Sequence, residues 1–186
     1  MITTKLGLAA AFVGAALVAA APAIAESVKT TTSASNGVRV EVFSDEFANR
    51  YEYAGPDVGT DGSYAWVSRV DRAGAKGPIS ISGIASYRGE WRFYNSAVFR
   101  GGDSAEFVQG SRDVGSCSGG RYSRGCSLTE TYHVRVAPEQ IEKYSVNGIL
   151  EIQVRSQRGE DIMLRVPVDQ FAAVSEVADS RTATRP

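Results

Sequence analysis

From residue 38 onward the chain alternates between apolar and polar positions, and this two-residue period predicts β-strands. Val38, Val40 and Val42 share one face of the first run, and turn residues (Gly, Pro, Asn and Asp) separate it from the next. Gly83 interrupts a later run and predicts either a β-bulge or a close approach to the backbone. The predicted strands are 38–43, 63–70, 79–87, 90–99, 104–114, 128–136, 149–156 and 161–168.

The last two of these strands form the clearest hairpin, because a tight turn at Arg158 and Gly159 separates them. Their apolar faces are expected to meet and to anchor the core. The residues concerned are Leu150, Ile152 and Val154, which face Ile162, Leu164 and Val166.

Two segments carry helical signals instead. In 137–148, Pro138 suits the first position of a helix, and Gly148 is placed to stop it. In 168–179, Phe171 begins an apolar stripe with helical spacing. We expect the first helix to connect two strands and the second to lie over one end or face of the sheet.

Many strands with two helices, and no strand–helix–strand alternation, indicate an all-β fold. We predict an antiparallel two-sheet sandwich with two short helices, because the strands are short and irregularly spaced and the first helix suits a crossover between sheets. A closed β-barrel is the alternative. The sequence has no internal repeat, which argues against a propeller or a solenoid.

The first 25 residues predict a secretory signal peptide. Lys5 precedes an uncharged run, and Ala23 and Ala25 form the small-x-small pattern that a signal peptidase reads. We therefore expect a periplasmic or secreted protein with no membrane anchor after cleavage. The predicted organisation is a signal peptide (1–25), a flexible lead (26–37), a single β-rich domain (38–178) and a flexible tail (179–186).

The net charge and the two cysteines limit which binding partners and cofactors are expected. With a formal net charge of −1, the chain has no strong field that would gather nucleic acid. Cys117 and Cys126 are the only cysteines, and the eight residues between them suit a disulfide-closed loop better than a redox site. We predict a disulfide and no cofactor.

The alternation places Glu130 on an apolar face, beside Leu128 and Tyr132. A buried carboxylate needs a partner or must stay protonated. We expect an ion pair with an arginine, for instance Arg92 or Arg100, and a catalytic acid is the rarer alternative.

His133, the only histidine, falls on the outer face of the same strand and is interpreted as a surface residue. No Gly-x-Ser-x-Gly motif accompanies it, so we assign no catalytic residue. The cysteines and His133 lack the spacing of a zinc site. Asp57 and Asp61 could bind calcium weakly, but turn chemistry accounts for both, and no metal is predicted.

An exposed loop is the best candidate for binding. Arg121, Tyr122 and Arg124 lie between the two cysteines, and Tyr with Arg is the composition of interface hot spots. Tyr122 and four other aromatic side chains could also form a platform that stacks sugars or grips a protein. The other four are Trp66, Tyr87, Trp91 and Tyr94.

Together these features predict an exported, non-catalytic binding or envelope-associated module whose ligand is a protein or a glycan. Two alternatives remain open. One is a small hydrolase of envelope polymers that uses Glu130 or His133. The other is a structural subunit of an envelope assembly.

Overall fold

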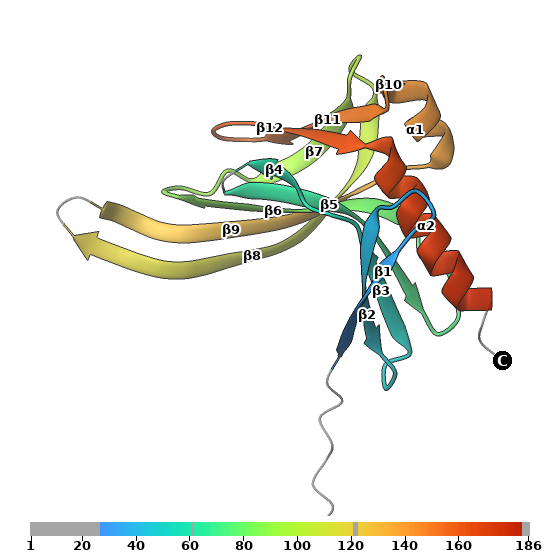
Figure 1. Cartoon of the computed structure of the whole chain (residues 1–186). Coiled ribbons are helices and arrows are strands. Elements are labelled where there is room, and N and C mark those ends of the chain that lie inside the picture. The colour runs from blue at the N-terminus through green and yellow to red at the C-terminus, as the bar shows by residue number, and fades with distance from the viewer. Residues whose placement is uncertain (1–26, 61, 121–122, 184–186) are drawn as a thin grey trace, which may run out of the picture.

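The computed structural model describes residues 27–60, 62–120 and 123–183, and these form twelve strands and two helices (Figure 1). The predicted all-β class is confirmed. The strands are β1 (Val28–Ser33), β2 (Arg39–Asp45), β3 (Arg50–Ala54), β4 (Val58–Thr60), β5 (Ser63–Arg72), β6 (Ile79–Arg88), β7 (Tyr94–Phe99), β8 (Ser104–Gly120), β9 (Ser123–Arg135), β10 (Ser145–Val146), β11 (Ile149–Ser156) and β12 (Ile162–Pro167). The helices are α1 (Pro138–Tyr144) and α2 (Val168–Ala183).

All twelve strands belong to one antiparallel sheet that is not closed into a barrel. Its order is β1-β2-β3-β5-β6-β9-β8-β7-β11-β10, with β4 beside β5 and β12 beside β11. The long strand β8 pairs with β9 over most of its length and with β7 at its start, through Ser104 and Ala105. Figure 1 shows β7, β11 and β12 lying over β4, β5 and β6. The two layers of the predicted sandwich are therefore parts of one folded sheet, and the barrel alternative is wrong.

The hairpin of β11 and β12 has the predicted register. Three pairs lie directly opposite one another: Leu150 and Val166, Ile152 and Leu164, and Val154 and Ile162. All six side chains are buried in the main core cluster, together with residues of α2. The match arises because a one-residue slip would turn every apolar side chain of a strand to solvent.

Gly83 marks a close approach rather than a bulge. The register from β5 through β6 to β9 continues across it without a shift. A Cβ atom built on Gly83 would lie only 2.3 Å from the ring of Tyr132, its partner on β9. The ring of Tyr132 therefore occupies the space that a side chain at position 83 would need.

Helix α1 begins at Pro138 as predicted, and the side chain of Gln140 accepts a hydrogen bond from the Ala137 N–H at its start. Helix α2 extends beyond the predicted end at residue 179. Its last turns are held by Asp179, which forms ion pairs with Arg69 at 3.0 Å and Lys76 at 2.7 Å. No helix in the described ranges is long and apolar enough to cross a membrane.

The predicted flexible end segments, 26–37 and 179–186, are too wide. Val28–Ser33 forms strand β1, which pairs with β2 along its whole length although all its side chains are exposed. Main-chain hydrogen bonds to β2 hold this segment in place. The alternation of apolar and polar residues did not predict the strand, because the segment has no apolar face. At the other end, α2 continues to Ala183.

Candidate functional site

Four features could carry function: a buried carboxylate cluster, a groove on the outer face of the sheet, a pocket between the helices, and a disulfide-linked hairpin. The carboxylate cluster centres on Glu130 of β9, which is only 2% exposed. One carboxylate oxygen accepts hydrogen bonds from the Tyr87 hydroxyl and from the Phe93 N–H at 3.0 Å. The other oxygen accepts from Nε of Arg112 at 3.0 Å and from the Tyr94 N–H at 3.3 Å.

The arginines that the sequence suggested as partners of Glu130 are wrong. Arg112 fills that role because it lies directly opposite Glu130 in the β8–β9 ladder, just after a register shift that the sequence does not reveal. The guanidinium of Arg92 instead lies over the ring of Tyr87, 4.5 Å from its centroid. Arg100 pairs with Glu151 at 3.0 Å.

The cluster keeps Glu130 ionised. Burial by itself raises the pKa of Glu130, but hydrogen bonds from Tyr87, Arg112 and the Phe93 N–H together hold that pKa below its ordinary value. With four donors around it and almost no exposed surface, the carboxylate has no free lone pair for a substrate. It anchors the loop between β6 and β7, in which Phe93 holds a left-handed φ of 56°.

His133 lies on the outer face of the sheet, as the alternation predicts, and it is exposed. Its Nδ1 is 2.8 Å from the Ser82 hydroxyl, which in turn lies 2.6 Å from the Ser68 hydroxyl. Partial burial of the ring lowers the pKa of His133, while Glu52 acts to raise it and Arg135 to lower it. The ring is therefore largely neutral at pH 7.

A histidine bonded to a serine is the minimal pairing for nucleophilic catalysis, but this pair lacks the remaining parts. Ser82 is only 4% exposed and lies in β6, whose main chain pairs with β5 on one side and β9 on the other. No adjacent pair of free N–H groups is offered for an oxyanion by such a central strand. The hydroxyl of Ser82 links Ser68 and His133 across the sheet.

The outer groove is the hollow on this same face, with a volume of about 480 Å³. It extends across β3, β5, β6, β9 and β8. Among its lining residues are Arg50, Glu52, Ser82, Val108, His133 and Arg135. Arg50 pairs with Glu52 at 2.6 Å, and Arg135 pairs with Glu106 at 2.5 Å, so much of its positive charge is balanced.

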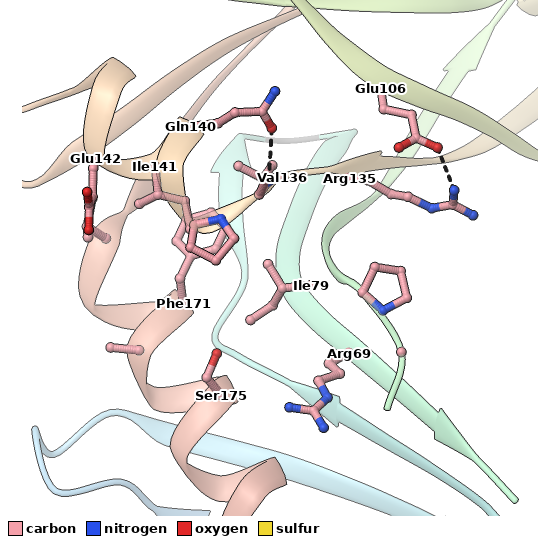
Figure 2. Close-up of a pocket in the computed structure, with 16 residues that line it drawn as sticks. Arg69, Ile79, Glu106, Arg135, Val136, Gln140, Ile141, Glu142, Phe171 and Ser175 are labelled. Atoms are coloured by element: carbon pink, nitrogen blue, oxygen red, sulfur yellow. Dashed lines mark hydrogen bonds and ion pairs between the residues drawn. The ribbon is translucent and has the colours of Figure 1, made fainter. Parts of the chain in front are cut away.

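The helix pocket lies between α1, α2 and the start of β6, with a volume of about 680 Å³ (Figure 2). Most of its wall is apolar, and its apolar residues include Ile79, Val136, Pro138, Ile141, Phe171 and Ala172. Figure 2 shows Ile79 and Phe171 on facing walls and the Arg135–Glu106 ion pair at one end. Arg69, which forms ion pairs with Asp71 and Asp179, and Ser175 lie toward the other end.

The sequence did not reveal the helix pocket. The pocket exists because the tertiary fold holds the two helices at a distance from each other, and local sequence patterns do not report that distance. The one local signal lies on α2. Ala172 and Ser175 lie off its buried stripe, and both are small enough to leave space beside Phe171.

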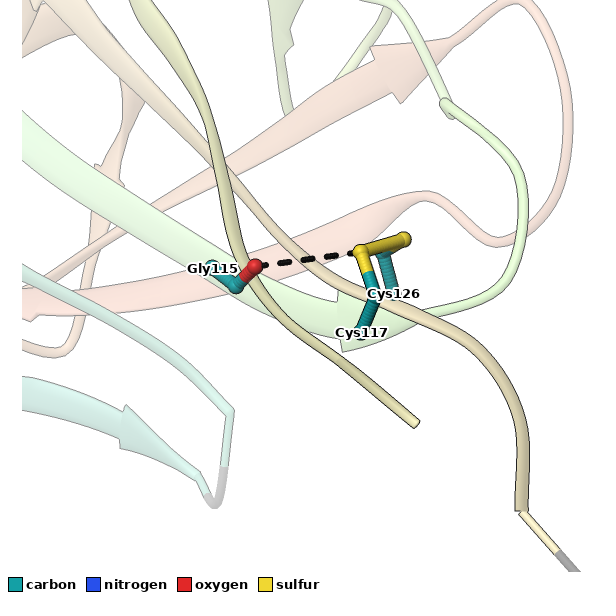
Figure 3. The surroundings of a disulfide bond; sticks show 3 residues. All are labelled: Gly115, Cys117 and Cys126. Carbon is teal, nitrogen blue, oxygen red and sulfur yellow. Dashed lines mark hydrogen bonds between the residues drawn. A yellow bond between two sulfur atoms is a disulfide. The ribbon is translucent and has the colours of Figure 1, made fainter. Parts of the chain in front are cut away.

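Cys117 and Cys126 form a disulfide and lie directly opposite each other in the β8–β9 ladder (Figure 3). The pairing between β6 and β9 ends at Arg88 and Ser127, so β8 and β9 pair only with each other beyond that point. We call this two-stranded end, residues 115–120 of β8 and 123–126 of β9, the hairpin arm. An isolated two-stranded ribbon is marginally stable, so the disulfide lies where the sheet gives least support.

Two residues of the predicted binding tip, Arg121 and Tyr122, lie outside the described residues, as does the side chain of Arg124. The tip therefore remains a prediction. Of the proposed aromatic platform, Tyr94 is buried in the core and Tyr87 belongs to the Glu130 cluster. Trp66 instead has a neighbour that the platform did not include, Tyr64.

Replacing both cysteines by serine (Cys117→Ser/Cys126→Ser) is expected to open the hairpin arm locally. The chain-entropy value for a loop of this length is about 2.5 to 3 kcal/mol. We expect the local opening free energy of the arm to fall by about that amount, and the global free energy of unfolding to fall by less, because the arm contributes little to the core. Amide hydrogen exchange across 114–128, beside urea unfolding, measures both. Unchanged exchange in the arm would contradict this.

No three His, Cys, Asp or Glu side chains come together as a metal site in the part of the chain that the structure describes. Asp61 lies outside that part. No protein family, curated protein or solved structure matches this chain. The site therefore has to be interpreted from its own geometry.

Proposed function

We propose that this chain is an exported, non-catalytic binding protein that holds the aliphatic part of an amphiphilic ligand in the helix pocket. The observation that carries the proposal is the pocket itself. Its volume lies in the range of small-molecule sites, and such sites are mostly apolar with a few polar groups that orient the ligand. Export is supported by the predicted signal peptide and by the disulfide, which suits an oxidising compartment.

The chemistry of the walls favours an aliphatic chain. Ile79, Val136 and Phe171 offer carbon surface without a row of donors or acceptors between them. The exposed Arg135–Glu106 pair at one end can exchange partners at little cost, since such surface pairs contribute little free energy. A ligand with an apolar tail and an anionic head would place its head beside Arg135.

Binding is favoured over the two alternatives. The proposed catalytic acid Glu130 is enclosed by its donors, and the serine that is hydrogen-bonded to His133 is itself buried. For an assembly subunit, a hydrophobic edge strand would be the supporting feature. The edge strand β1 instead has the polar sequence VKTTTS, and the edge strand β12 exposes the charged Arg165 beside Met163 and ends in Pro167, features that disfavour edge-to-edge pairing.

The test uses a dansyl-labelled long-chain fatty acid, whose emission rises when its chain enters an apolar site. We expect saturable binding to the wild type and a loss of about tenfold or more in affinity for Ala172→Trp. Ala172 is exposed and lines the pocket, so the indole would fill it without disturbing the core. Glu139→Trp on α1 is the matched control, because Glu139 is exposed and does not line the pocket.

Dansylglycine carries the dye without the chain and should not bind. Equal affinity of the fatty acid for the two tryptophan variants would contradict the proposal. So would equal binding of dansylglycine and the fatty acid.

A further inference from the structure

Two aromatic rings lie side by side on the outer face of the sheet. Tyr64 and Trp66 are two positions apart on β5, so both project from the face opposite Ala65 and Val67, which are buried in the core. Their rings are stacked, with centroids 6.0 Å apart and planes at 29°. Tyr64 is 39% exposed and Trp66 is half-buried. An exposed aromatic pair on an open sheet face is a contact surface that the core does not use.

The aromatic pair is continuous with the outer groove. In the sheet register Trp66 lies opposite Ser82, Ser82 opposite His133, and His133 opposite Val108. The last three residues all line the groove. Trp66 therefore stands at the end of a row that leads directly into it.

The groove offers hydrogen-bonding groups of both kinds. Glu52 supplies an acceptor, and Arg50 supplies donors, including an Nε that is buried without an acceptor among the described residues. Ser82 engages Nδ1 of His133, which leaves Nε2 as the ring nitrogen for a ligand. A ligand that presents several hydroxyl groups could use all of these at once.

Charge argues against a polyanion. Four arginines line the groove, and three of them, Arg50, Arg69 and Arg135, have carboxylate partners. Arg72 is the one without an ion pair among the described residues, so the groove lacks the run of free cations that phosphate or sulfate recognition uses. Sugars combine an apolar C–H face, which stacks on aromatic rings, with a rim of hydroxyl groups. Two neighbouring rings beside a polar groove match two successive units of such a ligand.

We propose that the outer face of β5, β6 and β9 binds a neutral oligosaccharide. Tyr64 and Trp66 stack on successive sugar rings, and Arg50, Glu52 and His133 hydrogen-bond to hydroxyl groups. The groove adjoins the helix pocket, and Arg69, Pro78 and Arg135 line both. None of Tyr64, Trp66, Arg50, Glu52 and His133 lines the helix pocket, so either site can bind its ligand without the other.

Isothermal titration with maltohexaose, cellohexaose and chitohexaose tests the proposal, with hexagalacturonate as the anionic comparison. We expect at least one neutral hexasaccharide to bind the wild type. Trp66→Ala and Tyr64→Ala should each weaken that binding about thirtyfold, the loss typical of an interface hot spot. Trp66→Phe keeps a ring and should retain most of the affinity.

Trp91→Phe is the matched control, because Trp91 is the other tryptophan and lies in the loop after β6. Circular dichroism verifies that each variant folds, and Tyr64→Ala, at an exposed position, keeps the test valid if Trp66→Ala does not. Fatty-acid binding in the helix pocket should be unchanged in all of them. Absence of binding by all three neutral sugars, binding of hexagalacturonate alone, or undiminished affinity in the alanine variants would overturn the proposal.

Discussion

Gly83→Ala is expected to destabilise the fold by about 3 kcal/mol, at the upper end of the usual cost of overpacking a core. The added Cβ would lie 2.3 Å from Cζ and 2.5 Å from the hydroxyl oxygen of Tyr132. The ring cannot move aside easily, because Tyr132 is fully buried and its centroid lies 6.2 Å from that of Tyr94 and 6.0 Å from that of Phe107. Urea unfolding of the purified protein measures the loss.

Two controls isolate this contact. Gly115→Ala places a methyl group at ordinary contact distance, 3.4 Å from Ser127, and should cost far less. Tyr132→Phe keeps the ring and removes a hydroxyl that is buried without a partner among the described residues, so stability should be unchanged or higher. A Gly83→Ala variant as stable as Gly115→Ala would show that Tyr132 does not limit position 83.

Glu130→Ala is expected to cost about 3 to 5 kcal/mol, the range found when one partner of a buried ion pair is removed. The change leaves Arg112 without its partner and removes the acceptor of the Tyr87 hydroxyl and of the Phe93 and Tyr94 N–H groups. Glu106→Ala is the matched control. It breaks the exposed pair with Arg135, whose expected contribution is below about 1 kcal/mol. Equal losses in the two variants would contradict the role given to Glu130.

The same carboxylate gives a pH signature. Because the folded state holds the pKa of Glu130 below its ordinary value, its stabilisation is complete above the unfolded pKa and is lost as the pH falls through the folded pKa. Glu130→Gln should therefore lose less stability than the wild type between about pH 5 and pH 2. Unfolding by urea at a series of pH values measures this difference, and parallel curves for the two proteins would refute it.

The alternation of apolar and polar side chains explains which parts of the structure the sequence could predict. It placed Leu150, Ile152 and Val154 opposite the correct strand, and it placed Glu130 on the buried face, because a strand with one buried face has only one register that fits. It could not identify Arg112 as the partner of Glu130. A register shift between Gln109 and Arg112 sets that pairing, and such a shift depends on main-chain geometry.

Contacts between elements that lie far apart in the sequence could not be predicted from local sequence patterns either. Strand β1 has no apolar face, so only its hydrogen bonding to β2 explains why this segment forms a strand. The helix pocket and the groove beside Trp66 depend on how helices and strands come together in three dimensions. The aromatic residues themselves were recognised from the sequence, but which of them share a surface was not.

The turn after β1 is tied to α2 by Ser35, whose N–H and hydroxyl both bond to the carboxylate of Glu176, 141 positions further along the chain. Closing so long a loop is entropically expensive and slows folding. A growing chain cannot make this contact until α2 has been synthesised, so its N-terminal strands stay incomplete while the rest is translated. The fold is therefore completed at its N-terminal end only by residues that are synthesised last.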